Sequence, residues 1–376
     1  MRLKSILISG FVAKTVAVTG VLVFGLVSCR KKIDHELGVQ EFITDQSTSG
    51  GGSGGGGGGG TSYTWAQITS AEIVNVMALQ EFNGELYVGG LFENTAGDIQ
   101  GFAKLDASDN LIHSGTSGFF GSWGVYDLHV YNNELIIGGG FTYYASGPNP
   151  EDLVRMNSSA VITDIPFSES LGHSVRNIME YNAGLLITGD FEMTATNWVT
   201  TTNVEMLSNY SAVGMADLTE TIYGSAEHQG ELYVCGPDEK LKVWLGSSWD
   251  DVAYVGLYWS DEVWDVISYN SELYIMGQFN NGITLKRMTS GGTWENVDEV
   301  AQLGGMSFYG GMKVIDNELY LFEGSLTVNG GAASGIIKYN GTSWGALGNF
   351  SYEAHDVAKL NGHLYIASDY GVFKSE

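Results

Sequence analysis

The chain has 376 residues, with 43 acidic against 17 basic side chains and a formal net charge of −26. A field of this sign repels nucleic acid and anionic lipid surfaces, and it favours cations or neutral molecules as partners. The alternative interpretation is that an acidic surface keeps a secreted protein soluble. The 53 glycines and only 4 prolines are typical of many tight turns between short strands.

Residues 1–28 have the pattern of a bacterial lipoprotein signal peptide. Arg2 and Lys4 precede an apolar run, residues 15–27, which is too short to span a bilayer comfortably as a permanent helix. The run is followed by Ser28-Cys29, and a small residue directly before a cysteine resembles the lipoprotein processing site. In that family the cysteine is acylated and the chain is cut before it. The resemblance implies that Cys29 anchors the protein to a membrane through its lipid. The alternative is an ordinary signal peptide with a chance cysteine.

The residues after Cys29 bear on the membrane in which the protein is retained and on the segment that links the lipid to the folded region. Arg30 replaces the aspartate that often retains lipoproteins in the inner membrane, and the charged run 29–36 is loosely similar to Bacteroidetes-type surface signals. This similarity implies an outer-membrane, surface-exposed protein, with the periplasmic face as the alternative. Residues 29–61 are rich in glycine and serine from residue 47 on, which predicts a flexible tether with no packed core.

From residue 62 onward one stretch recurs along the chain. Its first copy, residues 83–92, reads Asn-Gly-Glu-Leu-Tyr-Val-Gly-Gly-Leu-Phe. Seven copies are anchored by leucines at regular spacing: Leu86, Leu135, Leu185, Leu232, Leu273, Leu319 and Leu364. A period of about 45 residues indicates a repeat architecture rather than two or three ordinary domains.

Each repeat has the pattern of four short strands. In the sixth repeat they are residues 312–315, 318–322, 336–339 and 342–344, and Asn340-Gly341 is a strong hairpin signal. Four antiparallel strands per repeat of this length are typical of a β-propeller blade. The sequence therefore predicts an all-β, monomeric, seven-bladed β-propeller of four-stranded antiparallel blades over residues 62–376.

The two ends of this region are complementary. The seventh repeat stops after its third strand, at Phe373-Lys374, whereas Thr64-Trp65 precedes the first complete repeat and matches the start of a fourth strand. We expect the N-terminal strand to complete the last blade, which closes the ring without an open sheet edge. Four tryptophans follow the repeat and are expected to be structural: Trp65, Trp249, Trp294 and Trp344.

The repeat core, with Lys-Tyr-Asn-Gly-Thr-Ser-Trp at residues 338–344, resembles kelch-like and galactose-oxidase-like propellers over residues 62–376. Members of these families are largely binding platforms, and enzymes are a minority. The copper site of galactose oxidase cannot be carried over, because Cys235 lies inside a repeat strand and the histidines lack ligand spacing. The resemblance therefore implies a binding role without copper.

The residue type differs among the repeats at two consecutive positions, nine and eight residues before each anchor leucine. The first position holds Met77, Tyr126, Arg176, Tyr223, Trp264, Gly310 and His355. The second holds Ala78, Asp127, Asn177, Gly224, Asp265, Gly311 and Asp356. Such variety is unlike a packing requirement, so these residues are predicted to line the mouth of the central channel and to bind a glycan or peptide. The alternative is that they only hold water.

Other chemistry has weaker support. Asp127, Asp265 and Asp356 would suit a calcium ion, although no contiguous calcium loop is present. Loop aromatics are further candidate binding surfaces: Trp123, Trp198, Trp259, Tyr143 and Tyr144. The Gly-x-Ser-x-Gly pattern occurs only in the glycine-serine segment, at residues 51–55, and at the hairpin turn, at residues 341–345, so it does not mark a nucleophile elbow, and the chain has no His-Glu-x-x-His motif.

These patterns favour a non-catalytic outer-membrane or cell-surface lipoprotein that binds a glycan, a peptide or an envelope protein. One alternative is a carbohydrate-active hydrolase or lyase on the same scaffold. The other is a structural subunit of an outer-membrane complex that uses the blade rims as interfaces.

Overall fold

The computed structural model describes residues 63–70, 72–97, 99–113, 119–143, 151–165, 174–194, 200–236, 240–252, 261–279, 283–302, 310–331 and 334–376. The chain divides into two units, Met1–Gly57 and Gly58–Glu376, and every described residue belongs to the second. The predicted signal peptide, Cys29 and the tether lie outside the described residues. No helix in the described part of the chain is long and apolar enough to cross a membrane.

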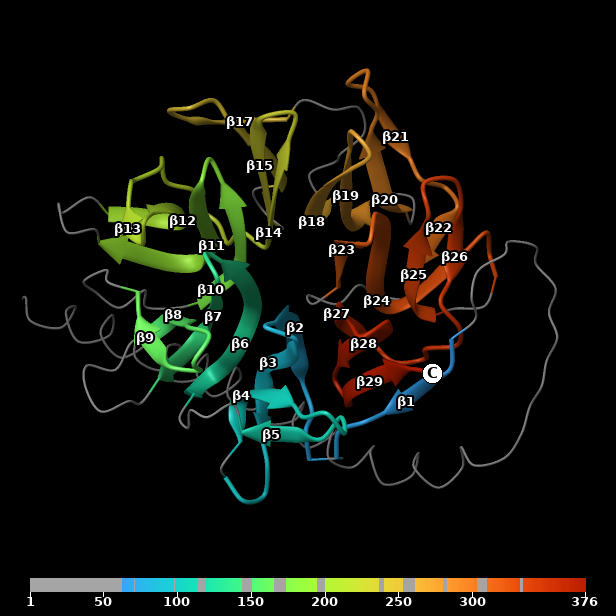
Figure 1. Cartoon of the computed structure of the whole chain (residues 1–376). Helices are drawn as coiled ribbons and strands as arrows, with labels where there is room; N and C mark the ends of the chain where they lie inside the picture. Colours follow the sequence, from blue (N-terminus) through green and yellow to red (C-terminus); the bar gives the residue numbers. More distant parts are fainter. Residues whose placement is uncertain are drawn as a thin grey trace, which may run out of the picture. The chain divides into compact units, whose positions relative to one another are not determined.

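The second unit is an all-β ring of seven sheets, as the sequence predicts (Figure 1). Blade 1 comprises β2 (Val76–Phe82), β3 (Glu85–Glu93), β4 (Gln100–Leu105) and β5 (Leu111–His113). Blade 2 comprises β6 (Phe119–Tyr131), β7 (Glu134–Tyr143), β8 (Glu151–Met156) and β9 (Ile162–Asp164). Blade 3 comprises β10 (Ser174–Tyr181), β11 (Gly184–Thr194), β12 (Thr200–Ser208) and β13 (Ser211–Ala212).

The later blades repeat this plan. Blade 4 comprises β14 (Gly224–His228), β15 (Glu231–Gly236), β16 (Lys240–Trp244) and β17 (Trp249–Asp251), and blade 5 comprises β18 (Glu262–Tyr269), β19 (Glu272–Phe279), β20 (Ile283–Met288) and β21 (Trp294–Asn296). Blade 6 comprises β23 (Gly311–Ile315), β24 (Glu318–Val328), β25 (Ser334–Tyr339) and β26 (Trp344–Ala346). An additional short strand, β22 (Val300–Gln302), pairs with the far end of β24 and has no counterpart in the predicted repeat.

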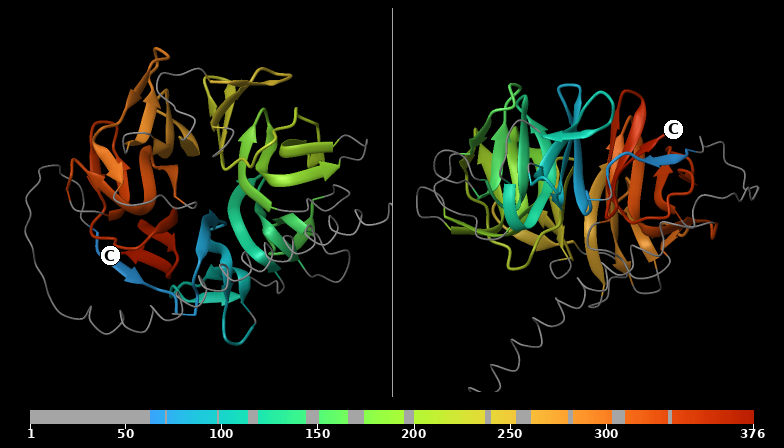
Figure 2. Two further views of the ribbon diagram at one scale, coloured as in Figure 1. Left: turned by 180° about the vertical axis from the view of Figure 1, so that it is seen from behind. Right: turned by 90° about the horizontal axis from the view of Figure 1, so that it is seen from below.

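Blade 7 is closed by the N-terminal strand, which confirms the prediction. It comprises β27 (Ala354–Leu360), β28 (His363–Ser368), β29 (Gly371–Ser375) and β1 (Trp65–Gln67). Strand β1 pairs antiparallel with β29, with Trp65 opposite Ser375, and the blue and red ends of the chain lie side by side (Figure 2). The indole Nε1 of Trp65 donates a hydrogen bond to the carbonyl oxygen of Leu347 at 2.7 Å.

The apolar residues of the repeat fill the junctions between blades. Seven clusters of buried side chains among the described residues each join two consecutive blades, and one of them joins blade 7 to blade 1. Strand residues alternate between junctions: Leu135 and Ile137 pack toward blade 1, whereas Ile136 packs toward blade 3. A strand buried on both faces needs apolar residues in succession, which explains the uninterrupted Leu-Tyr-Val pattern.

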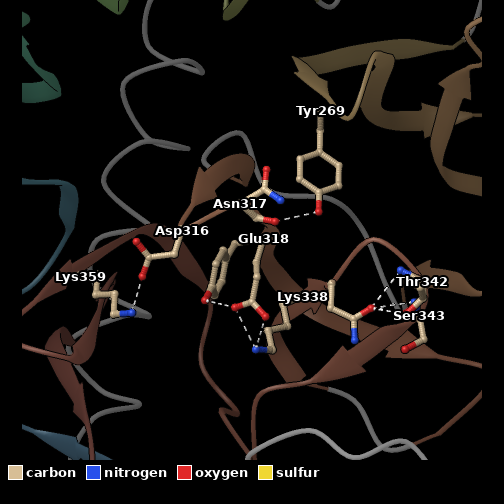
Figure 3. Close-up of polar contacts among 10 residues, drawn as sticks. Tyr269, Asp316, Asn317, Glu318, Lys338, Thr342, Ser343 and Lys359 are labelled. Carbon is tan, nitrogen blue, oxygen red and sulfur yellow. Dashed lines mark hydrogen bonds and ion pairs between the residues drawn. The ribbon is translucent and has the colours of Figure 1, made fainter.

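The polar residues that recur in the repeat connect the second and third strands of a blade. In blade 6, Glu318 accepts hydrogen bonds from Lys338 Nζ at 2.8 Å and from the Tyr320 hydroxyl at 3.1 Å (Figure 3). Blade 1 repeats this arrangement with Glu85, Tyr87 and Lys104. The glutamate before the anchor leucine and the basic residue on the third strand therefore belong to the scaffold.

The last glycine of the repeat is required by a close backbone approach. A Cβ atom on Gly277 would lie 2.0 Å from the carbonyl oxygen of Glu262, and one on Gly139 would lie 2.2 Å from that of Gly124. Both carbonyls belong to the innermost strand of the same blade. This close approach occurs where that strand is distorted, and the distortion positions the candidate site described next.

Candidate ligand site in the central channel

A cavity of about 380 Å³ lies where the innermost strands converge. Its lining includes all nine residues predicted for the channel mouth: Tyr126, Asp127, Arg176, Asn177, Tyr223, Trp264, Asp265, His355 and Asp356. The volume is within the range of pockets that hold small ligands. The structure therefore brings the predicted set together from five blades, although ligand binding there stays a prediction.

A β-bulge explains why two consecutive residues reach the same cavity. In β18, Val263 pairs with Gly277 and Asp265 pairs with Met276, so Trp264 is the extra residue. The same interruption occurs in four other innermost strands, where the extra residues are Met77, Tyr126, Arg176 and His355. In a regular strand neighbouring side chains point to opposite faces, and a bulge re-aims one of them.

Four of the predicted residues stack on one another in a continuous row, which we call the channel row: Tyr126, Arg176, Tyr223 and Trp264. The guanidinium carbon of Arg176 lies 4.7 Å from the ring centroid of Tyr126 and 4.9 Å from that of Tyr223. Tyr223 and Trp264 are stacked, with centroids 5.5 Å apart and planes at 13°. Tyr223 lies between Arg176 and Trp264, so its two faces are occupied. A ligand would meet the row through its edges and polar groups rather than by stacking on Tyr223.

Arg176 has no carboxylate and no hydrogen-bond acceptor among the described residues. Its Nε atom is buried without a partner there, and its guanidinium contacts the two tyrosine rings. The other described arginines are paired, Arg155 with Glu134 at 2.9 Å and Arg287 with Glu295 at 3.1 Å. Arg176 therefore presents its guanidinium edge as a hydrogen-bond donor in the channel.

Each of the three channel aspartates links two neighbouring blades through hydrogen bonds. Asp265 accepts hydrogen bonds from the backbone N–H of Val266 at 2.7 Å and from that of Met312, in the next blade, at 2.7 Å. Asp127 binds Leu128 and Ile178 in the same way, and Asp356 binds Val357 and Leu79. These contacts give the aspartates a structural role that the sequence did not predict.

Two of these carboxyl groups hold a proton more readily than free aspartate. Burial raises the pKa of Asp127 to about 7, outweighing the charge of Lys313 and the two backbone N–H donors. Burial likewise raises the pKa of Asp265 to about 7. The channel wall is therefore only partly ionised near neutral pH.

Lys313 is a channel residue that the sequence prediction missed. Its Nζ lies 2.9 Å from a carboxylate oxygen of Asp356 and 3.2 Å from the carbonyl oxygen of Leu79. Burial and the charge of Lys313 lower the pKa of His129, another lining residue, to about 4. Lys313 and His129 each lie six residues before an anchor leucine and two residues after the position that holds Asp127 in blade 2. Residues two apart in a strand face the same side, so this spacing could have predicted that both residues line the cavity.

The imidazole of His355 is engaged at the junction between blades 7 and 1. Its Nδ1 lies 2.8 Å from the carbonyl oxygen of Val76 and must donate, while Nε2 lies 3.4 Å from Asp369 and 3.7 Å from Glu353. Burial opposes a charged ring, but the neighbouring carboxylates of Glu353 and Asp369 and the carbonyl of Val76 outweigh burial and raise the pKa of His355. Only 5% of the His355 surface is exposed, so this residue supports the cavity wall and offers little surface to a ligand.

Within the described part of the chain, the one group of three potential metal ligands is Glu353, His355 and Asp369, with ligand atoms within 4.8 Å of one another. The three channel aspartates do not form such a group, and each is held by two backbone N–H groups. A calcium ion at Asp127, Asp265 and Asp356, the alternative to no cofactor, stays a prediction without support from this grouping.

The remaining aromatic candidates divide in two. Trp65 and Trp249 are structural as expected, and the indole of Trp249 donates a hydrogen bond to the carbonyl oxygen of Ala216 at 2.8 Å. Trp198, Trp259 and Tyr144 lie outside the described residues, as do the side chains of Trp123 and Tyr143.

Fold and site together define a seven-bladed β-propeller with a lined central cavity. No protein-family model matches the chain, and no curated protein matches it. Among solved structures, it is similar to a catalytically inactive virginiamycin B lyase from Staphylococcus aureus with quinupristin, at TM-score 0.52 and 9% identity over 83% of this chain and 98% of that one.

Two other structures show the same fold. The WD40 propeller domain of Doa1 matches at TM-score 0.54 and 10% identity, over 83% of this chain and 96% of that one. A domain described as the extracellular part of a hybrid two-component system from B. thetaiotaomicron matches at TM-score 0.57 and 12% identity, over 83% of this chain and 40% of that one. Identities this low establish the propeller fold alone and carry over no activity.

Proposed function

We propose that this protein is a non-catalytic cell-surface lipoprotein of the kelch-like and galactose-oxidase-like type whose propeller binds a glycan, peptide or envelope protein in its central channel. The observation that carries the proposal is the channel row beside the 380 Å³ cavity, with Arg176 as a donor that no described residue satisfies. Pockets with a few convergent polar groups on a rigid scaffold are the usual place for ligand recognition.

The repeat itself supports this location. The glutamate, tyrosine and glycine positions that recur in the blades are used in packing and in contacts within each blade, so they are scaffold. The residues that differ between blades line the cavity, and site residues on rigid strands are well placed for specific binding.

The test is a glycan array paired with a pull-down on the full-length protein and on its Tyr126→Ala and Trp264→Phe variants. Tyr370→Ala is the matched control, because Tyr370 is an exposed aromatic residue that does not line the cavity. We expect each channel variant to weaken binding about tenfold or more, the loss of a good contact, while the control binds normally. Binding that neither channel variant changes would refute the site. A copurifying protein with no glycan bound would favour a structural subunit instead.

Anchoring is tested separately, since Cys29 lies outside the described residues. The lipoprotein proposal rests on Ser28-Cys29 at the end of the apolar run. The wild-type protein should incorporate labelled palmitate, and the Cys29→Ala variant should not, because it lacks the thiol that carries the lipid. Equal labelling of the two proteins would exclude lipidation at this residue.

A further inference from the structure

The guanidinium of Arg176 is arranged to receive an anion. Its central carbon lies over the rings of both Tyr126 and Tyr223, 4.7 and 4.9 Å from the two ring centroids. Its Nε atom has no hydrogen-bond partner among the described residues. A guanidinium that two rings restrain and no acceptor satisfies can form a fork of two parallel hydrogen bonds with an arriving anion.

The charge balance of the protein makes an unpaired arginine unusual. Acidic residues outnumber basic ones 43 to 17, and the other cation of the cavity, Lys313, is paired with Asp356. Partial burial of a guanidinium costs free energy that its tyrosine contacts offset only in part. No described carboxylate forms an ion pair with Arg176, and the three aspartates of the same cavity are engaged by backbone N–H groups instead. This points to a carboxylate that arrives with the ligand.

We infer that Arg176 binds the carboxylate of a sugar acid, so that the ligand class of the proposed site is a uronate-containing glycan; this inference rests on the proposed function. A single planar carboxylate suits the fork geometry of arginine. Asp127, Asp265 and Asp356 line the same cavity, so a doubly charged phosphate would meet stronger repulsion than a monoanion.

The rest of the lining favours a sugar over a peptide. Beside the three aspartates, the cavity wall includes Asn177 and Ser225, which hydrogen-bond to each other, and apolar side chains such as Met77 and Phe322. A sugar presents both hydroxyl groups and apolar C–H groups to such a mixed wall. A peptide with a free carboxylate is the competing ligand, and the experiment below includes one.

The experiment measures binding of trigalacturonate, its fully methyl-esterified form and a tripeptide with a free carboxylate to the full-length protein by calorimetry at fixed salt. The ester keeps the sugar frame and removes the charge. The variants are Arg176→Met, which removes the charge, and Arg176→Lys, which keeps it without the fork. Lys359→Met is the control, since it changes the net charge equally at a lysine outside the cavity lining.

We expect the wild-type protein and Lys359→Met to bind the acid on the order of tenfold or more tightly than the ester, the worth of a charge-assisted hydrogen bond. Arg176→Met should bind the two equally, and Arg176→Lys should fall between. Equal binding of acid and ester by the wild type, or a preference that survives Arg176→Met, would overturn the inference and leave channel binding intact. Binding of the tripeptide alone would also overturn it. If none of the three binds, the inference fails, and the glycan array with Tyr126→Ala decides the proposed function separately.

Discussion

Asp265 illustrates how one side chain at the channel serves two neighbouring blades. Its two carboxyl oxygens accept the N–H groups of Val266 and Met312, at 2.7 Å each. These N–H groups belong to innermost strands, which have a partner strand on one side only. Asp127 and Asp356 repeat the arrangement at two other junctions. A carboxyl group is needed because a single side chain must accept from two directions.

Asp265→Ala should destabilise the propeller by about 2–4 kcal/mol, because two buried backbone donors lose their acceptor. Asp265→Asn should also destabilise it, since the amide nitrogen would face a donating N–H. Urea unfolding measures both. Glu227→Ala is the control, because Glu227 is exposed on β14. Equal stability of the control and the Asp265 variants would show that the two hydrogen bonds to Asp265 do not stabilise the propeller.

His355 predicts a pH dependence of stability. Its pKa is raised in the folded protein despite burial, by Glu353, Asp369 and Val76. The folded state therefore binds the proton more tightly, so this contribution is fully present below pH 6.5, the ordinary histidine value, and is lost as pH rises through the folded pKa.

The comparison is between the wild type and His355→Gln at pH 5.5 and pH 9. The variant should be less stable by about 1–3 kcal/mol at the lower pH, and the difference should shrink at the higher pH. Any repacking cost is present at both values, so the change in the difference reports the charge. A difference that is the same at both pH values would contradict the charged contact.

At the scale of the strand, the bulge is the element that makes the site. In β18 it leaves Trp264 without a partner in β19 and turns it toward the cavity beside Asp265. The neighbouring strand accommodates the bulge with Gly277, where a Cβ would lie 2.0 Å from the Glu262 carbonyl oxygen. The same bulge therefore directs the varying residue into the cavity and requires a glycine on the neighbouring strand.

Gly277→Ala should cost about 1–3 kcal/mol, because the added methyl group meets backbone that cannot move aside cheaply. Gly324→Ala is the matched control in β24, where a Cβ would have no atom within 4 Å. Thermal unfolding should show a clear loss for the first and a change within about 0.5 kcal/mol for the second. Similar behaviour of the two variants would argue against the close approach.

Much of this structure was predictable, for physical reasons that differ by feature. The anchor leucine and the Asn-Gly hairpin signals report local strand and turn chemistry, so the blade and the closing strand followed from them. The bulge did not follow, because it depends on the pairing of two strands rather than on either alone. The interblade hydrogen bonds of the channel aspartates and the engagement of His355 were missed for the same reason, since their partners are up to 279 residues away along the chain.

At the scale of the whole molecule, closure joins the two ends of the described chain. Strand β1 has only three residues, yet it supplies the outer edge of blade 7. Trp65 packs against Tyr63 and Phe350, with ring centroids 5.8 Å apart in each case. The stability of the ring is therefore sensitive to one short strand that no covalent crosslink retains.

Trp65→Ala should destabilise the propeller by about 3 kcal/mol, since it removes an aromatic contact and the hydrogen bond to Leu347. Trp294→Ala removes the same side chain from the same repeat position in blade 5, where chain connectivity holds the blade at both ends. We expect the Trp65 variant to lose more stability in urea. An equal loss would show that closure adds nothing beyond ordinary blade packing.

The central claim is that a ligand binds in the channel at Arg176. The direct measurement is the NMR spectrum of the full-length protein with ¹⁵N-labelled arginine during titration with trigalacturonate. The Nε–H signal of Arg176, identified by its absence in Arg176→Met, should shift in proportion to binding while those of Arg155 and Arg287 stay in place. Calorimetric binding that leaves the Arg176 signal unmoved, or a titration that moves no signal and releases no heat, would contradict the claim.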